Sequence, residues 1–161
     1  MSHVITKSLE QLAQIHKDLL VVSMEKTSKV KEGSIDDLQA LLLKERKLIR
    51  LSEQAESNRQ QTVEAWCKEN RIALKDATIT NILQHVTDIA EQEELEKAAI
   101  KLTDVMTKLK QQEQLNQVLI SQSMQFVQLS LDLMSPTLKS MNYGANSEME
   151  SSSRSVFDSK A

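Results

Sequence analysis

Residues 89–134 read IAEQEELEKAAIKLTDVMTKLKQQEQLNQVLISQSMQFVQLSLDLM, and this stretch decides the fold. It contains neither Gly nor Pro, and its apolar residues recur at steps of three and four, which predicts one continuous α-helix. At roughly 1.5 Å per residue, such a helix would be about 70 Å long. A helix of that length needs other helices along its apolar side. We therefore expect an antiparallel, coiled-coil-like bundle.

The chain before residue 89 offers two partner helices. In the first, apolar side chains from Ile5 to Leu19 repeat on one face, which predicts a helix over about 2–31. Gly33 follows this segment, and glycine readily takes the left-handed conformation that closes a helix. We therefore expect the first helix to end at this glycine.

The second helix is expected over 35–70. Ser34 precedes it, and Asp37 three residues later completes a capping-box pattern that would satisfy free backbone N–H groups. Its apolar seam consists of Leu38, Leu41, Leu42, Leu48, Ile49, Ala55, Val63 and Trp66. The polar residues that interrupt this seam are Glu45, Ser52 and Arg59. We therefore expect a narrow buried stripe on a largely solvated helix.

Two signals lie between the second helix and the long one. A short helix is expected at 80–85, where apolar residues stand among turn-favouring Asp and Thr. Asp88, with Glu91 three residues later, is a cap candidate for the long helix over 89–134. The dipeptide Ser135-Pro136 is expected to end that helix, because proline cannot continue the hydrogen-bond ladder.

Composition supports one small all-α domain. The 161 residues suffice for about one domain, and only two glycines and one proline are available for turns. Aromatic residues make up 2% of the chain, so aliphatic side chains must build the core along helix seams. We predict an all-α, elongated antiparallel three-helix coiled-coil-like bundle with one short extra helix over 1–134. A flexible, serine-rich, mobile C-terminal tail is expected over 135–161.

The charge pattern excludes several classes of partner. The 20 basic and 23 acidic residues are interleaved and leave a net charge of −3, which argues against nucleic acid. Uninterrupted apolar runs are far shorter than the roughly 20 residues of a membrane span. The first residues are too polar for a signal peptide, and the lone Cys67 cannot form an internal disulfide. We therefore expect a cytoplasmic protein without membrane insertion.

The sequence contains no pattern typical of a catalytic or metal site. His3, His16 and His85 lie far apart, and none is spaced with Cys67 or another His as a metal ligand would be. Two glycines are too few for a phosphate-binding loop, and the paired carboxylates stand at helix starts, where the helix dipole favours them. We predict no enzyme, no metal and no cofactor. Cys67 and its neighbour Trp66 are expected in the core.

The second half of the long helix departs from ordinary bundle packing. The first half keeps one seam among many charges: Leu95, Ala99, Leu102, Met106 and Leu109. From Gln114 to Leu131 there is no charged residue, and two apolar seams can be traced. One seam consists of Leu115, Leu119, Phe126, Leu129 and Leu133. The other consists of Ile120, Met124, Val127, Leu131 and Met134. One long helix in a three-helix bundle can bury only one such seam.

Two interpretations of the seams stay open. In the first, the other helices or a second copy of the chain cover both seams as ordinary core. In the second, a partner covers them, because the neutral Ser and Gln between them can be buried at lower desolvation cost than Lys or Glu. Adaptable Met and Leu suit an amphipathic helix laid into a groove. On this hypothesis the partner-binding residues are Leu115, Leu119, Ile120, Met124, Phe126, Val127, Leu131 and Met134.

The first two helices contain a recurring set of leucines and polar residues: Leu9, Leu12, Leu19, Leu20, Lys26, Val30, Gly33, Asp36, Leu38, Leu41, Glu45, Leu48, Ile49 and Arg59. This set resembles the pattern of the FlgN family of flagellar type III export chaperones. The layout is also similar, with long N-terminal helices, a short linking helix, a long C-terminal helix and a tail that contains Tyr-Gly. The resemblance covers most of the chain.

The resemblance implies a specific role. Members of the family bind the C-terminal helical ends of the hook-filament junction proteins FlgK and FlgL, prevent their early association and deliver them to the export gate protein FlhA. Cargo binding then falls on the charge-free half of the last helix, and gate docking on a tyrosine just after it. Tyr143, followed by Gly144, occupies that place. The alternative is an incidental aromatic residue in a loop.

A structural homodimer is the competing hypothesis. In it, the second seam pairs with that of another copy, and the protein serves as a coiled-coil adaptor. Permanent coiled coils usually keep charged flanking positions that set their register, and residues 114–131 have none. The sequence leaves open whether the free protein is a monomer or a homodimer.

Overall fold

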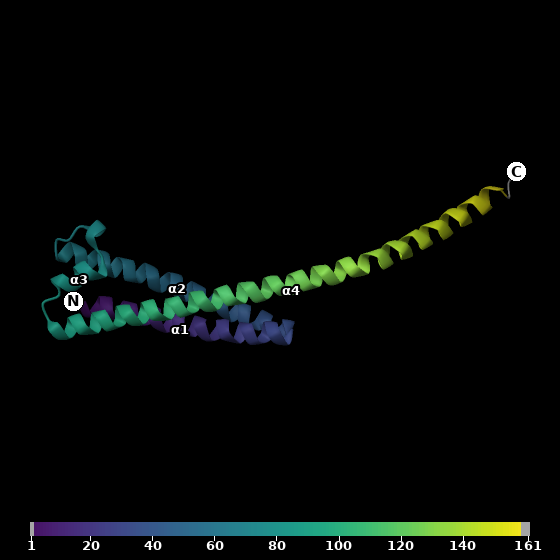
Figure 1. The fold of residues 1–161 in the computed structure, drawn as a ribbon. Helices are drawn as coiled ribbons and strands as arrows, with labels where there is room; N and C mark the ends of the chain where they lie inside the picture. Colours follow the sequence, from purple (N-terminus) through teal and green to yellow (C-terminus); the bar gives the residue numbers. More distant parts are fainter. Residues whose placement is uncertain (1, 159–161) are drawn as a thin grey trace. The chain divides into compact units, whose positions relative to one another are not determined.

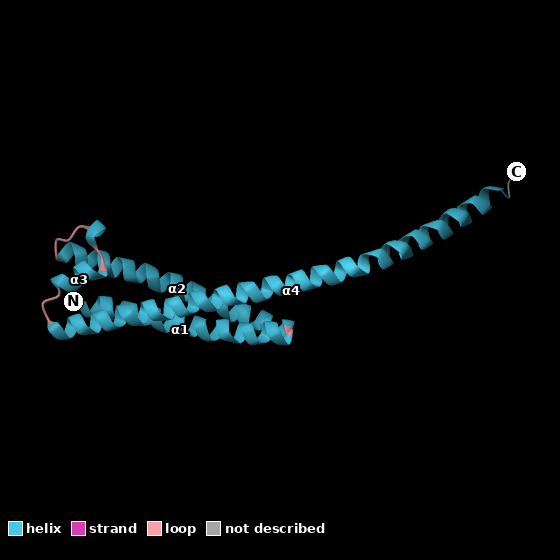
Figure 2. Cartoon of the chain, in the orientation of Figure 1, coloured by secondary structure: helices cyan, strands magenta, loops and turns pink. Residues whose placement is uncertain are grey.

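The computed structural model describes the backbone of residues 2–158 and the side chains of residues 2–134. Within residues 2–158 the regular secondary structure is entirely helical (Figure 2). The elements are α1 (Ser2–Glu32), α2 (Ile35–Glu69), a short 3-10 helix η1 (Leu74–Asp76), α3 (Ile79–His85) and α4 (Ile89–Asp158). The predicted all-α class is therefore confirmed, and α3 is the predicted short extra helix.

The chain divides into two compact units, Met1–Leu119 and Ile120–Ala161. The first unit contains α1, α2, α3 and the beginning of α4, and its long helices lie side by side (Figure 1). Ser2 at the start of α1 donates a hydrogen bond to Glu91 near the start of α4, and Lys26 near the end of α1 binds Glu113. α1 and α4 are therefore parallel, and α2 runs antiparallel to both. This arrangement is the predicted elongated three-helix bundle.

An aliphatic core fills the end of the first unit that holds α3. Its buried members come from all four helices and the α3–α4 connection: Ile5, Leu9, Val63, Trp66, Cys67, Ile82, Val86, Leu95 and Ala98. Ile82 of α3 and Leu95 of α4 are almost completely shielded from solvent. The core positions predicted for Trp66 and Cys67 are confirmed. Burial also raises the pKa of the Cys67 thiol, so this cysteine has little thiolate character near neutral pH.

On α2, the buried row contains the polar residues that the sequence predicts as interruptions. Glu45, Ser52 and Arg59 are half-buried and follow one another at seven-residue steps, within the same row as buried Leu41 and Ala55. The stripe is therefore continuous and includes polar positions. The seam had also been predicted to include two residues that the structure exposes, Leu42 and Ile49.

On α4, the first half buries Leu95 as predicted but selects a neighbouring residue at two positions of the predicted seam. Val105 is buried where Met106 was predicted, and Met106 is exposed. Ala98 is likewise more deeply buried than Ala99. Both members of each pair are apolar, so periodicity alone could not choose between them. The positions of α1 and α2 select the residue that faces the core.

The end of α1 confirms the role predicted for Gly33. This glycine has a φ of +70°. Its N–H group donates to the carbonyl of Val30 at 3.2 Å, and the N–H of Ser34 donates to the carbonyl of Lys29 at 3.1 Å. These two bonds satisfy carbonyls that the helix end would otherwise leave free, which defines a Schellman motif.

The end of α2 repeats the motif with a non-glycine residue. Arg71 has a φ of 56°, in the left-handed region that L residues enter at an energetic cost. Its N–H donates to the carbonyl of Lys68 at 3.3 Å, and the N–H of Ile72 donates to the carbonyl of Cys67 at 2.9 Å. The cost at Arg71 is therefore offset by two hydrogen bonds and by the burial of Cys67 beside it.

The predicted helix caps are confirmed only in part. Ser34 precedes α2, but its hydroxyl donates to the Asp37 carboxylate at 2.9 Å and makes no bond to a backbone N–H group, so the capping box is wrong there. At the start of α4, the Asp88 carboxylate accepts a hydrogen bond from the Ala90 N–H at 2.8 Å, as a cap does. Glu91 does not complete the box at Asp88, because it accepts the hydroxyl of Ser2.

The predicted end of the last helix is corrected. α4 continues past Met134 and Ser135-Pro136 to Asp158. A proline inside a helix removes one backbone hydrogen bond and costs roughly 3 kcal/mol, but helices can continue through it when the flanking residues keep their own bonds. The side chains of the serine-rich segment 135–161 lie outside the described residues, and its predicted mobility stays a prediction.

Two substitutions should shift stability in opposite directions at the two Schellman motifs. Gly33→Ala should lower the free energy of unfolding by about 1 kcal/mol. No atom lies within 4 Å of the added Cβ, so the cost comes from the backbone conformation alone. Arg71→Gly should raise it by about 0.5 kcal/mol, because glycine relieves the left-handed strain. Urea unfolding monitored by circular dichroism measures both changes.

Arg71→Ala serves as the matched control for this pair. It removes the same long side chain while keeping the unfavourable φ, so it should not stabilise the protein. Stabilisation by Arg71→Ala equal to that by Arg71→Gly would show that the side chain, and not the backbone, carries the effect.

Candidate partner-binding surface

Nearly all of the predicted partner-binding residues are exposed on α4. Leu119 is half-buried, whereas Met124 and Phe126 have 68% and 70% of their surface exposed. The other exposed members are Leu115, Ile120, Val127, Leu131 and Met134. Leu115 and Leu119 belong to the first unit, and the remaining six belong to the second. Exposed apolar side chains that gather in this way mark interaction sites more often than isolated ones do.

The second unit carries these apolar residues in two rows along one helix. One row contains Ile120, Met124, Val127, Leu131 and Met134, and the other contains Phe126, Leu129 and Leu133. Two polar residues between the rows find partners within the helix itself. Gln128 Nε2 donates to Asp132 Oδ1 at 3.1 Å, and Ser130 Oγ donates to the Phe126 carbonyl at 2.9 Å. The apolar rows are therefore the part of this helix that a partner can desolvate at least cost.

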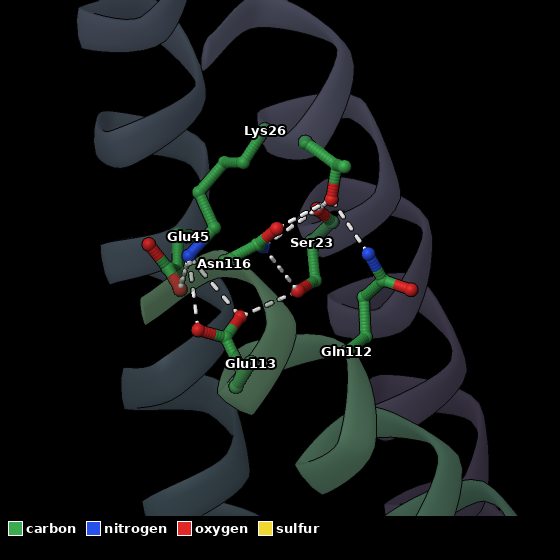
Figure 3. Close-up of polar contacts among 7 residues, drawn as sticks. Ser23, Lys26, Glu45, Gln112, Glu113 and Asn116 are labelled. Carbon is green, nitrogen blue, oxygen red and sulfur yellow. Dashed lines mark hydrogen bonds and ion pairs between the residues drawn. The ribbon is translucent and has the colours of Figure 1, made fainter. Parts of the chain in front are cut away.

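A buried hydrogen-bond network joins α1 to α4 at the start of the charge-free stretch (Figure 3). Asn116 is buried, and its Nδ2 donates to the carbonyl of Ser23 at 2.9 Å and to the Ser23 hydroxyl at 3.0 Å. Its Oδ1 accepts the hydroxyl of Thr27, which in turn accepts Gln112 Nε2 at 2.6 Å. The amide thus has a partner on both of its polar atoms.

An ion-pair triad adjoins this network and links all three long helices (Figure 3). Lys26 Nζ of α1 lies 2.8 Å from Glu45 Oε1 of α2 and 3.1 Å from Glu113 Oε1 of α4. Glu113 also accepts the Ser23 hydroxyl at 2.7 Å. Burial by itself lowers the pKa of Lys26, but the hydrogen bonds to the two glutamates outweigh it and raise the pKa above 10.5. Lys26 is therefore charged throughout the neutral range.

This polar layer sets the register of the bundle. Among the described residues, no buried side-chain nitrogen or oxygen lacks a hydrogen-bond partner. Sliding one helix by a turn would separate Asn116 or Lys26 from its partners and leave buried polar groups unpaired, which is costly. The sequence analysis did not identify this layer. The seven-residue spacing of Glu45, Ser52 and Arg59 could have indicated that polar groups lie within the seam.

Neither a metal site nor a membrane-spanning helix is present among the described residues. Among the described residues, no group of three His, Cys, Asp or Glu side chains could hold a metal ion. No described helix is both long and apolar enough to cross a bilayer. The backbone of Tyr143, the predicted gate-docking residue, lies within α4 and not after it as predicted, and its side chain is outside the described residues.

Comparison with known proteins shows that nearly the whole chain is similar to one family. A family model described as FlgN protein matches residues 1–151. A relative in Bacillus subtilis (strain 168), named Uncharacterized protein YvyG, is 32% identical over 160 residues, which cover 98% of this chain and 97% of the relative. No solved structure gives a significant match. The similarity therefore includes both the bundle and most of α4.

Removing the cation from the triad should destabilise the bundle. Lys26→Met should lower the free energy of unfolding by about 2–3 kcal/mol, because Glu45 and Glu113 lose their shared partner. The pKa of Lys26 is raised in the fold, so its contribution is complete below about pH 10.5 and is lost as the pH rises through the folded pKa. The difference between wild type and variant should therefore shrink in strongly alkaline solution. Urea unfolding at several pH values measures it.

The matched control replaces the whole triad. Lys26→Met combined with Glu45→Leu and Glu113→Leu removes all three charges together and should recover most of the lost stability, as apolar replacements of buried ion pairs often do. A triple variant less stable than Lys26→Met would contradict this account of the triad.

Proposed function

The chain belongs to the FlgN family of flagellar export chaperones, and we propose from this premise that it binds the C-terminal helical segments of the junction proteins FlgK and FlgL. It holds them in the cytosol, prevents their premature association and delivers them to the export gate protein FlhA. The function requires stoichiometric binding and no catalysis, in keeping with a family of chaperones.

The observation that carries this proposal is the exposure of the apolar rows on α4. Between Gln114 and Leu131 the helix has no charged side chain, yet it keeps large apolar residues such as Met124 and Phe126 at the surface. Exposing these residues to water adds no stability to the helix, because apolar side chains contribute stability only when they are buried, by roughly 25 cal/mol per Å². A partner helix laid along these rows would supply that burial.

The polar residues of the stretch suit repeated capture and release. Gln122, Ser123 and Ser130, which lie in or between the rows, are neutral, so covering them removes less hydration energy than covering a charged side chain would. Methionine adapts its flexible side chain to different neighbours, which helps one surface accept two related junction proteins. The binding surface thus combines apolar affinity with a low cost of desolvation.

A homodimeric coiled-coil adaptor is the second candidate function, because the same exposed rows could pair with those of another copy. A permanent dimer would bury Met124 and Val127 in the absence of any cargo. Light scattering with and without a junction-protein peptide separates the two functions. A dimer that is unaffected by the peptide supports the adaptor, and a chain that forms a stoichiometric peptide complex supports the chaperone.

Delivery to the gate is assigned to Tyr143 by the family resemblance. An exposed tyrosine can bury its ring in a partner pocket while its hydroxyl finds a hydrogen bond, so one residue can anchor a transient contact. Cargo capture and gate docking would then use different residues of the same chain.

Charge placed in the apolar rows should weaken cargo binding. Val127→Glu would force an ionised carboxylate into a desolvated helix interface, so affinity for a synthetic FlgK C-terminal peptide should fall at least tenfold, or about 1.4 kcal/mol. Ser121→Glu is the matched control, because it adds the same charge to the same helix on its polar side. Calorimetry measures both, with circular dichroism to verify helicity. Equal affinities for wild type and Val127→Glu would remove this row from the interface.

Tyr143→Ala should separate capture from delivery. Affinity for the junction peptide should stay within about twofold of wild type, because the substitution lies outside the apolar rows. Binding of the chaperone–cargo complex to the cytosolic domain of FlhA should be lost, since one buried aromatic can carry most of a small interface. Calorimetry tests the first arm and a pull-down the second. A weaker peptide complex would place Tyr143 in the cargo site, and no change in either arm would reject the docking role.

A further inference from the structure

A second exposed surface lies on α2, in the first unit. Three large apolar residues, Ile35, Leu42 and Ile49, follow one another at seven-residue steps, and 68%, 44% and 43% of their surfaces are exposed. The row lies beside the buried row of α2 and not within it. Leu43, with 61% of its surface exposed, stands further from the core. This part of α2 therefore offers apolar side chains at the spacing by which one helix packs against another.

Cations surround this apolar row. Arg46 comes four residues after Leu42 and three before Ile49, so it lies in the same row on the helix surface. Lys47 and Arg50 follow within the next turn, and all three cations are exposed. We refer to Ile35, Leu42, Leu43, Arg46, Lys47, Ile49 and Arg50 as the basic face of α2.

Among the residues whose side chains the structure describes, the cations of the basic face have no ion-pair partner. The ion pairs of the described residues involve Lys26, Lys29, Arg59, Lys97 and Lys108, and none involves Arg46, Lys47 or Arg50. Of the nearby acidic residues, Glu45 turns inward to Lys26, and the exposed Glu53, three residues after Arg50, takes part in none of these ion pairs. Like charges three and four residues apart repel one another and weaken an isolated helix. The basic face is therefore arranged for negative charge from another molecule.

We propose that the basic face of α2 docks an acidic amphipathic helix of a second protein, distinct from the cargo. The partner's apolar seam would cover Ile35, Leu42 and Ile49, and Glu or Asp flanking that seam would reach Arg46, Lys47 and Arg50. Arginine suits this role because its planar guanidinium can bind a carboxylate through two parallel hydrogen bonds. The row spans two heptads, so the partner segment needs about four helical turns.

The pattern favours a protein helix over a lipid surface. Helices that lie on membranes present a broad apolar face to the bilayer, with basic residues on the other side. On α2, one side of the helix is already buried in the bundle. The exposed apolar residues form only a narrow row, and Arg46 lies within that row. A single row bordered by charges matches helix-to-helix recognition, in which flanking charges select the partner.

The basic face differs in chemistry from the candidate cargo surface. The rows on α4 lie in a stretch without charge, whereas the α2 row is bordered by three cations. One surface therefore selects apolar helices, and the other selects acidic ones. The inference stands independently of the proposed function, because it rests on α2 alone.

The test uses a designed acidic peptide about three heptads long, with Leu at positions a and d and Glu at positions e and g. Mutual repulsion of the glutamates keeps it from pairing with itself. A second peptide carries Lys in place of Glu. Fluorescence anisotropy against the full chain should show saturable binding of the acidic peptide, at least tenfold tighter than binding of the basic one, and weaker at high salt.

Charge reversal supplies the decisive comparison. Arg46→Glu with Arg50→Glu should weaken the acidic peptide at least tenfold and improve binding of the basic peptide. Lys97→Glu with Lys101→Glu is the matched control, because it reverses two exposed charges at the same spacing on α4 and should leave affinity within about twofold. Both sites are exposed, so both variants should keep wild-type helicity. Affinity for the junction-protein peptide should be unchanged in the Arg46/Arg50 variant.

Four results would overturn the proposal. The wild-type chain could fail to bind the acidic peptide, or the control variant could weaken it as much as the Arg46/Arg50 variant does. Binding to phosphatidylglycerol vesicles without binding to the peptide would assign the face to lipid. Self-association that Arg46→Glu with Arg50→Glu abolishes, and that the acidic peptide cannot displace, would assign the face to a second copy of the chain.

Discussion

The long helices of the first unit bury only narrow stripes of side chains, wider on α1 than on α2, and the other features of the molecule depend on this limit. With aromatic residues at 2% of the chain, the rows are aliphatic and the core is narrow. Its most shielded residues include Ile5, Ile82 and Leu95, which belong to one buried cluster. Apolar residues in excess of the rows must stay at the surface. The chain has many of them, and they are grouped on α2 and α4.

A narrow aliphatic seam specifies register poorly, because one heptad packs much like the next. The polar layer removes that ambiguity. Lys26 is held by glutamates from two other helices, and the amide of Asn116 is bonded on both polar atoms, so a shifted register would leave these groups buried without partners. The layer lies near the point where α4 passes into its charge-free stretch. The bundle is thus specified most firmly at the level where the candidate cargo surface begins.

The two exposed surfaces differ in what a partner must provide. On α4, neutral polar residues border the apolar rows, so the binding energy of the proposed complex would come from desolvation of both partners. On α2, unpaired cations border a shorter row, so a partner must also bring negative charge. If both surfaces bind helices as proposed, the chain can discriminate between ligands by charge. Neither surface needs a ligand-sized pocket, because a helix is recognised along its length.

The sequence by itself determined the features that depend on near neighbours in the chain. Gly33 ends α1, Asp88 caps α4, and the absence of charge after Glu113 singled out the exposed part of α4 as a candidate surface. Only the tertiary structure decided that Val105 and not Met106 faces the core, and that Glu113 shares a cation with a residue of α2. The two kinds of feature differ in how far apart in the sequence their interacting residues lie. A cap or a periodic pattern depends on residues within about one turn, whereas burial and ion pairs depend on side chains contributed by helices far away in the sequence.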